Sequence, residues 1–198
     1  MTLDLLIPLA LFGIASSITP GPNNLMLLAS GANFGLRRTL PHMLGISLGH
    51  AFMVAMVGLG LMQLFDLLPW LRISLMVVSA AYLLYLAWKI ANAAPPEDAP
   101  QKGRPFTFLQ AAGFQWVNPK AWYMAIYAQT NFTTPDANWS AAIAVALVFA
   151  VVNFPSVAVW AWGGTQLKRF LSTGRRLRVF NVTMALLLVA SLYPMLTS

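Results

Sequence analysis

The sequence predicts an all-α integral membrane protein whose six transmembrane helices form two inverted three-helix repeats, with the first and fourth helices broken near mid-membrane. Three observations support this fold class: the composition, the lengths of the apolar segments and the placement of proline inside two of them. Of the 198 residues, 59% are hydrophobic and only 9% are charged. A soluble domain has about 25% charged residues, so this chain cannot cover a water-facing surface.

Six apolar segments each reach the roughly 20 residues that a transmembrane helix needs. The first is expected to remain as a helix, because no basic residue precedes it and no small-residue cleavage site follows a short apolar core. The absence of cysteine excludes disulfides and thiol chemistry, and the sequence indicates no cofactor and no metal site. The six segments are Leu3–Ser30, Pro41–Phe65, Pro69–Ile90, Phe106–Thr130, Trp139–Gly163 and Leu177–Leu196.

Lysine and arginine gather in alternate loops, and this pattern predicts the orientation. Ten basic residues follow the first, third and fifth spans, whereas the opposite loops contain only Arg72. Because short cytoplasmic loops collect positive charge, both termini are expected outside the cytoplasm. The net charge of +7 then contacts the anionic headgroups of the lipid bilayer, and nucleic acid is not an expected partner.

A polar and proline-rich segment divides the six spans into three and three. We expect a first repeat over residues 1–91, a cytoplasmic linker over 92–105 and a second repeat over 106–198, all within one membrane domain. Because each half has an odd number of spans, the second half enters the membrane from the opposite side. The inverted repeat is inferred from this topology, since the two halves show only weak similarity in sequence.

Each half begins with a span that helix-breaking residues interrupt, "SSITPGPNNLML" in the first span and "FQWVNPKAWYMA" in the fourth. Proline removes a backbone donor and clashes with the preceding turn, so each motif should end one half-helix and begin another. Asn118 and Pro119 have the order of an N-cap and a first helical residue, and Thr19 with Pro20 is interpreted in the same way. Interrupted spans at matching positions indicate the binding site of a transporter.

In an inverted pair, the N-termini of the two new half-helices would face one central region. Each would present unpaired N–H groups and about half a positive charge, which suit an anion such as a carboxylate. Gly21 would let the chain approach this ligand closely. Lys120 favours the same interpretation, because a lysine at this depth costs about 2.5–3.5 kcal/mol and needs a partner or a wet cavity. The alternative is that Lys120 snorkels, or bonds carbonyls that the breaks free.

The motifs "TPGPNN" in the first span, "GISLGHAFMVAMVGLGL" in the second and "NPKAW" in the fourth resemble those of the LysE/RhtB superfamily of amino-acid exporters. The length and the number of spans are similar from end to end. The resemblance implies export of amino acids or related small carboxylates across a bacterial inner membrane, by proton antiport with alternating access. By position, it implies a substrate-binding region of Pro20, Gly21, Pro22, Asn23, Asn118, Pro119 and Lys120, to which the first break adds Thr19.

Other polar residues in the spans are weaker candidates. Some branches of the superfamily have an acidic residue in the second span, associated with cationic substrates, whereas this chain has His50 there. A zwitterion with a neutral side chain is therefore the expected substrate. His50 is also the candidate for proton coupling, because histidine changes charge near neutral pH; a structural histidine is the alternative. Asn24, Gln115 and Asn153 are second-tier candidates, and His42 is expected to be solvated at the membrane edge.

Gly45 and Gly49 form a G-x-x-x-G motif in the second span. Small residues let membrane helices approach closely, and we expect this face to pack within the chain. The seam of a homodimer is the alternative.

Three other function classes fit the sequence less well. An exporter of ions or metals would need buried carboxylates, cysteines or clustered histidines. An intramembrane enzyme would need a nucleophile with a base in reach, and no catalytic residue is evident. A purely structural membrane protein would not explain a buried lysine beside two helix breaks.

Overall fold

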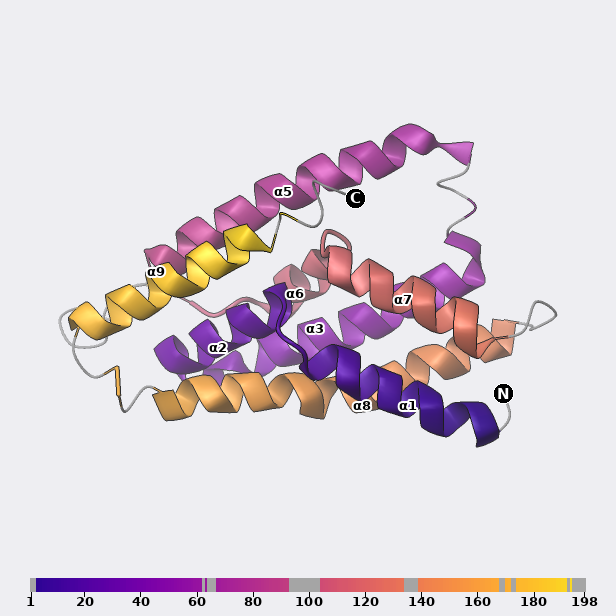
Figure 1. Ribbon diagram of the computed structural model, residues 1–198, viewed down its shortest axis with the longest axis horizontal. Helices are drawn as coiled ribbons and strands as arrows, with labels where there is room; N and C mark the ends of the chain where they lie inside the picture. The colour runs from indigo at the N-terminus through magenta and orange to yellow at the C-terminus, as the bar shows by residue number, and fades with distance from the viewer. Residues whose placement is uncertain are drawn as a thin grey trace.

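The computed structural model describes residues 3–61, 63, 67–92, 104–133, 139–167, 170–171, 174–191 and 193, and every regular element in them is helical (Figure 1). The predicted all-α class is therefore confirmed for this part of the chain. In chain order the elements are α1 (Leu3–Ile18), α2 (Pro22–Phe34), α3 (Leu36–Met56), the π-helical turn η1 (Val57–Leu61), α5 (Pro69–Ala91), α6 (Phe108–Gln115), α7 (Pro119–Phe132), α8 (Trp139–Leu167) and α9 (Gly174–Ala190).

Apolar helices of membrane-spanning length identify a multi-pass membrane protein. Within the described residues, three segments are long and apolar enough to cross a bilayer, Leu36–Leu61, Ile73–Ala91 and Trp139–Leu167. A fourth results if Leu5–Ile18 and Pro22–Phe34, which are bent by 57° at their junction, count as one broken span. The two remaining predicted spans correspond to α6 with α7 and to the 17-residue α9, so the total of six spans stays a prediction.

Both predicted interruptions are present in the structure. The first separates the end of α1 at Ile18 from the start of α2 at Pro22, and the second separates the end of α6 at Gln115 from the start of α7 at Pro119. From its break, α2 leads toward one end of the molecule, whereas α7 leads toward the other end (Figure 1). The N-termini of the two half-helices therefore both lie in the middle.

Helix α8 is the centre of the packing, because α1, α2 and α3 all contact it. Glycine makes the closest of these contacts. A Cβ atom on Gly164 would meet the carbonyl oxygen of Leu28, and one on Gly31 would meet that of Ala161. Helices α2 and α8 thus approach backbone to backbone, as small residues permit in membranes.

The G-x-x-x-G face of α3 packs against α6. A Cβ atom on Gly45 would meet the carbonyl oxygen of Phe108, and one on Gly49 would lie 2.5 Å from Cα of Ala112. The prediction that this motif packs within the chain is confirmed.

Helices α5 and α9 pack on one another along one flank of the molecule (Figure 1). The α2–α3 junction, the ends of α5 and α8 and the start of α9 all lie at the same end. These segments contain most of the basic residues behind the predicted orientation. Residues 93–103 of the predicted linker, together with Lys168 and Arg169, lie outside the described residues.

The prediction that His42 is solvated is wrong. Its side chain is fully buried, and its ring lies edge-on to Phe106 with the ring centroids 5.1 Å apart. Neither ring nitrogen has a hydrogen-bond partner among the described residues. The expectation failed because the segment that precedes α6 places Phe106 over this face of α3.

Candidate functional site

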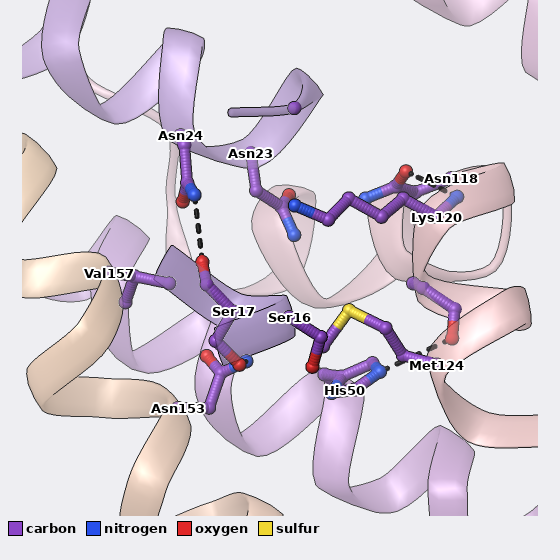
Figure 2. Close-up of a pocket in the computed structure, with 12 residues that line it drawn as sticks. Ser16, Ser17, Asn23, Asn24, His50, Asn118, Lys120, Met124, Asn153 and Val157 are labelled. Carbon is purple, nitrogen blue, oxygen red and sulfur yellow. Dashed lines mark hydrogen bonds between the residues drawn. The ribbon is translucent and has the colours of Figure 1, made fainter. Parts of the chain in front are cut away.

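A cavity of about 20 Å³ lies where the two helix breaks meet (Figure 2). A space of this size holds about one water molecule, so a larger solute would fit only if the lining residues moved apart; we call the present arrangement the contracted state. Five helices and the two breaks supply the lining residues, which are Ser16, Ser17, Gly21, Asn23, Asn24, His50, Asn118, Lys120, Ala121, Met124, Asn153 and Val157.

Most of the residues predicted for the site line this cavity or touch a residue that does. The other predicted residues do not line the cavity but lie next to it in the structure. Thr19 and Pro20 bind the side chain of Lys120, and Pro22 and Pro119 each begin a half-helix. Gln115 forms hydrogen bonds with Asn23.

The ammonium group of Lys120 reaches across from α7 to the first break. Its Nζ donates to the carbonyl oxygen of Thr19 at 2.7 Å, to Oγ1 of Thr19 at 2.9 Å and to the carbonyl oxygen of Pro20 at 3.3 Å. In this state Lys120 therefore bonds the carbonyls that the break frees, which is the alternative raised from the sequence. A Cβ atom on Gly21 would lie 2.8 Å from Cδ of Lys120, so glycine gives the lysine room to lie against the break.

Side chains of α8 and α2 also donate to carbonyls at the end of α1. Nε1 of Trp160, on α8, donates to the carbonyl of Ile18 at 2.9 Å. Nδ2 of Asn24 donates to the carbonyls of Ser17 at 2.8 Å and of Thr19 at 2.7 Å. Because backbone groups inside a bilayer must be bonded within the protein, α2, α7 and α8 together make this break tolerable.

The two half-helix N-termini differ. Oδ1 of Asn118 accepts from the backbone N–H of Lys120 at 3.2 Å, so the predicted N-cap of α7 is confirmed. The N-cap of α2 is Gly21, not Thr19, and no side chain in the described structure caps it. The prediction failed because Thr19 closes α1, with its N–H bonded to the carbonyl of Ala15. The first N–H groups of α2 consequently keep their partial positive charge beside the cavity.

Asn23 and Gln115 form a reciprocal amide pair that joins the two breaks. Nδ2 of Asn23 donates to Oε1 of Gln115 at 2.8 Å, and Nε2 of Gln115 donates back to Oδ1 of Asn23 at 3.1 Å. Gln115 is completely buried. It therefore positions Asn23 at the cavity wall without lining the cavity itself.

A polar wall on the opposite side links α1, α3 and α8. Nδ2 of Asn153 donates to Oγ of Ser17, and Oγ of Ser47 donates to Oδ1 of Asn153, both at 3.1 Å. Nε2 of His50 lies 3.3 Å from the carbonyl oxygen of Ala121, so Nε2 is the donor. Nδ1 of His50 is buried without a hydrogen-bond partner among the described residues.

Ser16, Ser17, Ala121, Met124 and Val157 line the cavity but were not identified from the sequence. Two signals could have found some of them. The serines directly precede the first proline motif, and Met124 lies one helical turn after Lys120 and so on the same face of α7. No acidic side chain is among the described lining residues, and the described residues contain no group of three or more side chains suited to a metal.

Comparison with known proteins places the sequence in a family. Residues 14–191 match the family model of LysE type translocators. Cysteine/O-acetylserine efflux proteins are similar along most of their length. That of Klebsiella pneumoniae subsp. pneumoniae is 33% identical over 193 residues, covering 96% of this chain and 95% of the relative. That of Escherichia coli K12 is 31% identical over 191 residues, covering 96% of both chains. No solved structure matches.

Proposed function

The chain belongs to the family of LysE type translocators, and from this premise we propose that it exports small amino acids with neutral side chains from the cytoplasm. Cysteine and O-acetylserine, which name the activity of the relatives, are the first candidate substrates. Both are zwitterions with small neutral side chains. The proposal places the protein in a bacterial inner membrane with both termini outside.

The observation that supports this function best is the meeting of the two breaks at one cavity. A substrate carboxylate could bind Lys120 in place of the Thr19 and Pro20 carbonyls, and could also accept from the uncapped N–H groups of α2. Since the described lining has no acidic side chain, a second positive charge on the substrate would find no counter-ion. A neutral side chain fits this wall better than a cationic one.

The same arrangement supports the proposal of alternating access. We take residues 1–91 and 106–198 as two inverted three-helix repeats, joined by the cytoplasmic linker, that rearrange around the central site. When the substrate carboxylate binds Lys120, the hydrogen bonds from Lys120 to Thr19 and Pro20 are broken. These hydrogen bonds connect α7 to the first break. The cavity can then widen beyond its contracted volume. His50, whose ring bonds α7 through Ala121, is the residue proposed to couple the cycle to a proton.

Counterflow in reconstituted vesicles tests the transport function. Vesicles loaded with unlabelled L-cysteine under a reductant should accumulate labelled L-cysteine, chemically unchanged, whereas vesicles loaded with lysine should not. An imposed pH gradient should drive L-cysteine against its own gradient. Failure to carry any small neutral amino acid would contradict the proposed function. Transport that does not respond to the pH gradient would contradict proton antiport but not export itself.

A further inference from the structure

We propose that Oδ1 of Asn24 binds the α-ammonium group of the substrate, so that the cavity recognises an amino acid at both of its charged ends. The inference rests on the proposed function, in which Lys120 and the N-terminus of α2 bind the carboxylate.

The side-chain amide of Asn24 has a fixed orientation. Only 2% of the residue is exposed, and Nδ2 donates to the carbonyl oxygens of Ser17 and Thr19 at 2.8 and 2.7 Å. Both partners are acceptors, so the nitrogen must face them and the oxygen must face elsewhere. Oδ1 has no hydrogen-bond partner in the described structure although it is buried. A buried acceptor of this kind needs a donor, and none of the described residues supplies one.

Asn24 lies at the right place for the second end of an amino acid. Its Nδ2 and the Nζ of Lys120 are each 2.7 Å from the same carbonyl oxygen, that of Thr19. The two nitrogens are therefore separated by at most twice this distance. Oδ1 belongs to the same amide group as Nδ2, and in an α-amino acid one carbon atom joins the carboxylate to the ammonium group, so a single molecule can reach both residues.

A neutral acceptor suits the ammonium group of a zwitterion, because the substrate's own carboxylate already balances its charge. Nδ1 of His50 is the other buried lining atom without a partner in the described residues. His50 belongs to α3, however, whereas Asn24 belongs to the first turn of α2 beside the uncapped N–H groups. The geometry thus places the ammonium site next to the carboxylate site.

The first test compares two solutes that differ only at the α-carbon. L-Cysteine and 3-mercaptolactate share the carboxylate and the thiol, but a hydroxyl replaces the ammonium group in the latter. Because of the free energy of a hydrogen bond to a charged group, we expect L-cysteine to compete for counterflow at least about tenfold more strongly than 3-mercaptolactate. Equal competition by both solutes in the unmodified protein would overturn the inference while leaving transport itself intact. If neither solute competes, L-cysteine is not a substrate, and the proposed function fails as well if no other small neutral amino acid is carried.

The second test uses Asn24→Leu with Asn33→Leu as the matched control. Asn33 lies on the same helix and is also buried, but its Oδ1 accepts from Nδ2 of Asn181 at 3.2 Å. In Asn24→Leu, the preference for L-cysteine over 3-mercaptolactate should fall toward one, whereas Asn33→Leu should keep the unmodified ratio whatever its total activity. An unchanged ratio in Asn24→Leu would show that Asn24 only caps α1. If this variant does not insert, the comparison of the two solutes in the unmodified protein decides alone.

Discussion

Replacing Lys120 with methionine removes the ammonium group while it keeps most of the volume of the side chain. In the contracted state, Lys120→Met loses the three hydrogen bonds to Thr19 and Pro20. Both of these residues are exposed, and the Thr19 carbonyl still accepts from Asn24. Because the Thr19 carbonyl keeps this donor, we expect the free energy of unfolding to fall by only about 1 kcal/mol. The variant should insert in normal amounts.

Transport should suffer more than stability. A hydrogen bond between the ammonium group and a substrate carboxylate is worth about 1.5–3 kcal/mol, and every 1.4 kcal/mol corresponds to about tenfold in an equilibrium constant. We therefore expect kcat/KM for L-cysteine to fall about 10- to 150-fold. The decrease should appear for every substrate with a carboxylate, whatever its side chain.

The assay is counterflow in vesicles that contain equal amounts of each protein. Lys89→Met is the matched control, because Lys89 is a lysine at the end of α5 whose Nζ lies 4.5 Å from the centroid of the Phe106 ring, outside the cavity. The control should keep at least half of the unmodified rate. If Lys120→Met transports L-cysteine as fast as the unmodified protein, Lys120 does not bind the carboxylate and the reasoning is refuted.

Three further substitutions test the cavity and the helix packing around it. Gly21→Ala would bring a Cβ atom within 2.8 Å of Cδ of Lys120. Because the lysine side chain can shift, counterflow should fall by less than in Lys120→Met. A larger loss than in Lys120→Met would contradict this expectation. His50→Gln retains a donor for α7, so counterflow should persist while acceleration by an imposed pH gradient disappears; retained acceleration would exclude His50 as the coupling residue. Gly164→Leu would force a side chain into the carbonyl of Leu28. Overpacking costs about 1–3 kcal/mol, so the melting temperature in detergent should fall by several degrees. An unchanged melting temperature would contradict this expectation.

The sequence predicts the features of the fold that depend on local backbone chemistry. Proline determines where each helix is interrupted, and Asn118 caps α7 because asparagine before proline favours a helix start. The residue that begins the helix after the first break could not be predicted correctly, because the two prolines there offer two possible helix starts. In the structure, the backbone hydrogen bond from Thr19 to the carbonyl of Ala15 shows that Thr19 closes α1.

The rest of the site depends on contacts between distant segments. Val157 and Ser17 meet at the cavity because α1 packs against α8, and no spacing within one helix reveals that contact. The amide pair of Asn23 and Gln115 joins positions 92 residues apart. The burial of His42 likewise results from a segment that the sequence does not place near it.

The carbonyls at the end of α1 also have a consequence for the order of assembly. Their donors on α7 and α8, Lys120 and Trp160, lie 101 and 142 positions further along the chain than the residues they bond. When the nascent first half enters the bilayer, the ribosome has not yet made either donor. The hydrogen bonds that Lys120 and Trp160 donate to this break can therefore form only after the later helices have been made.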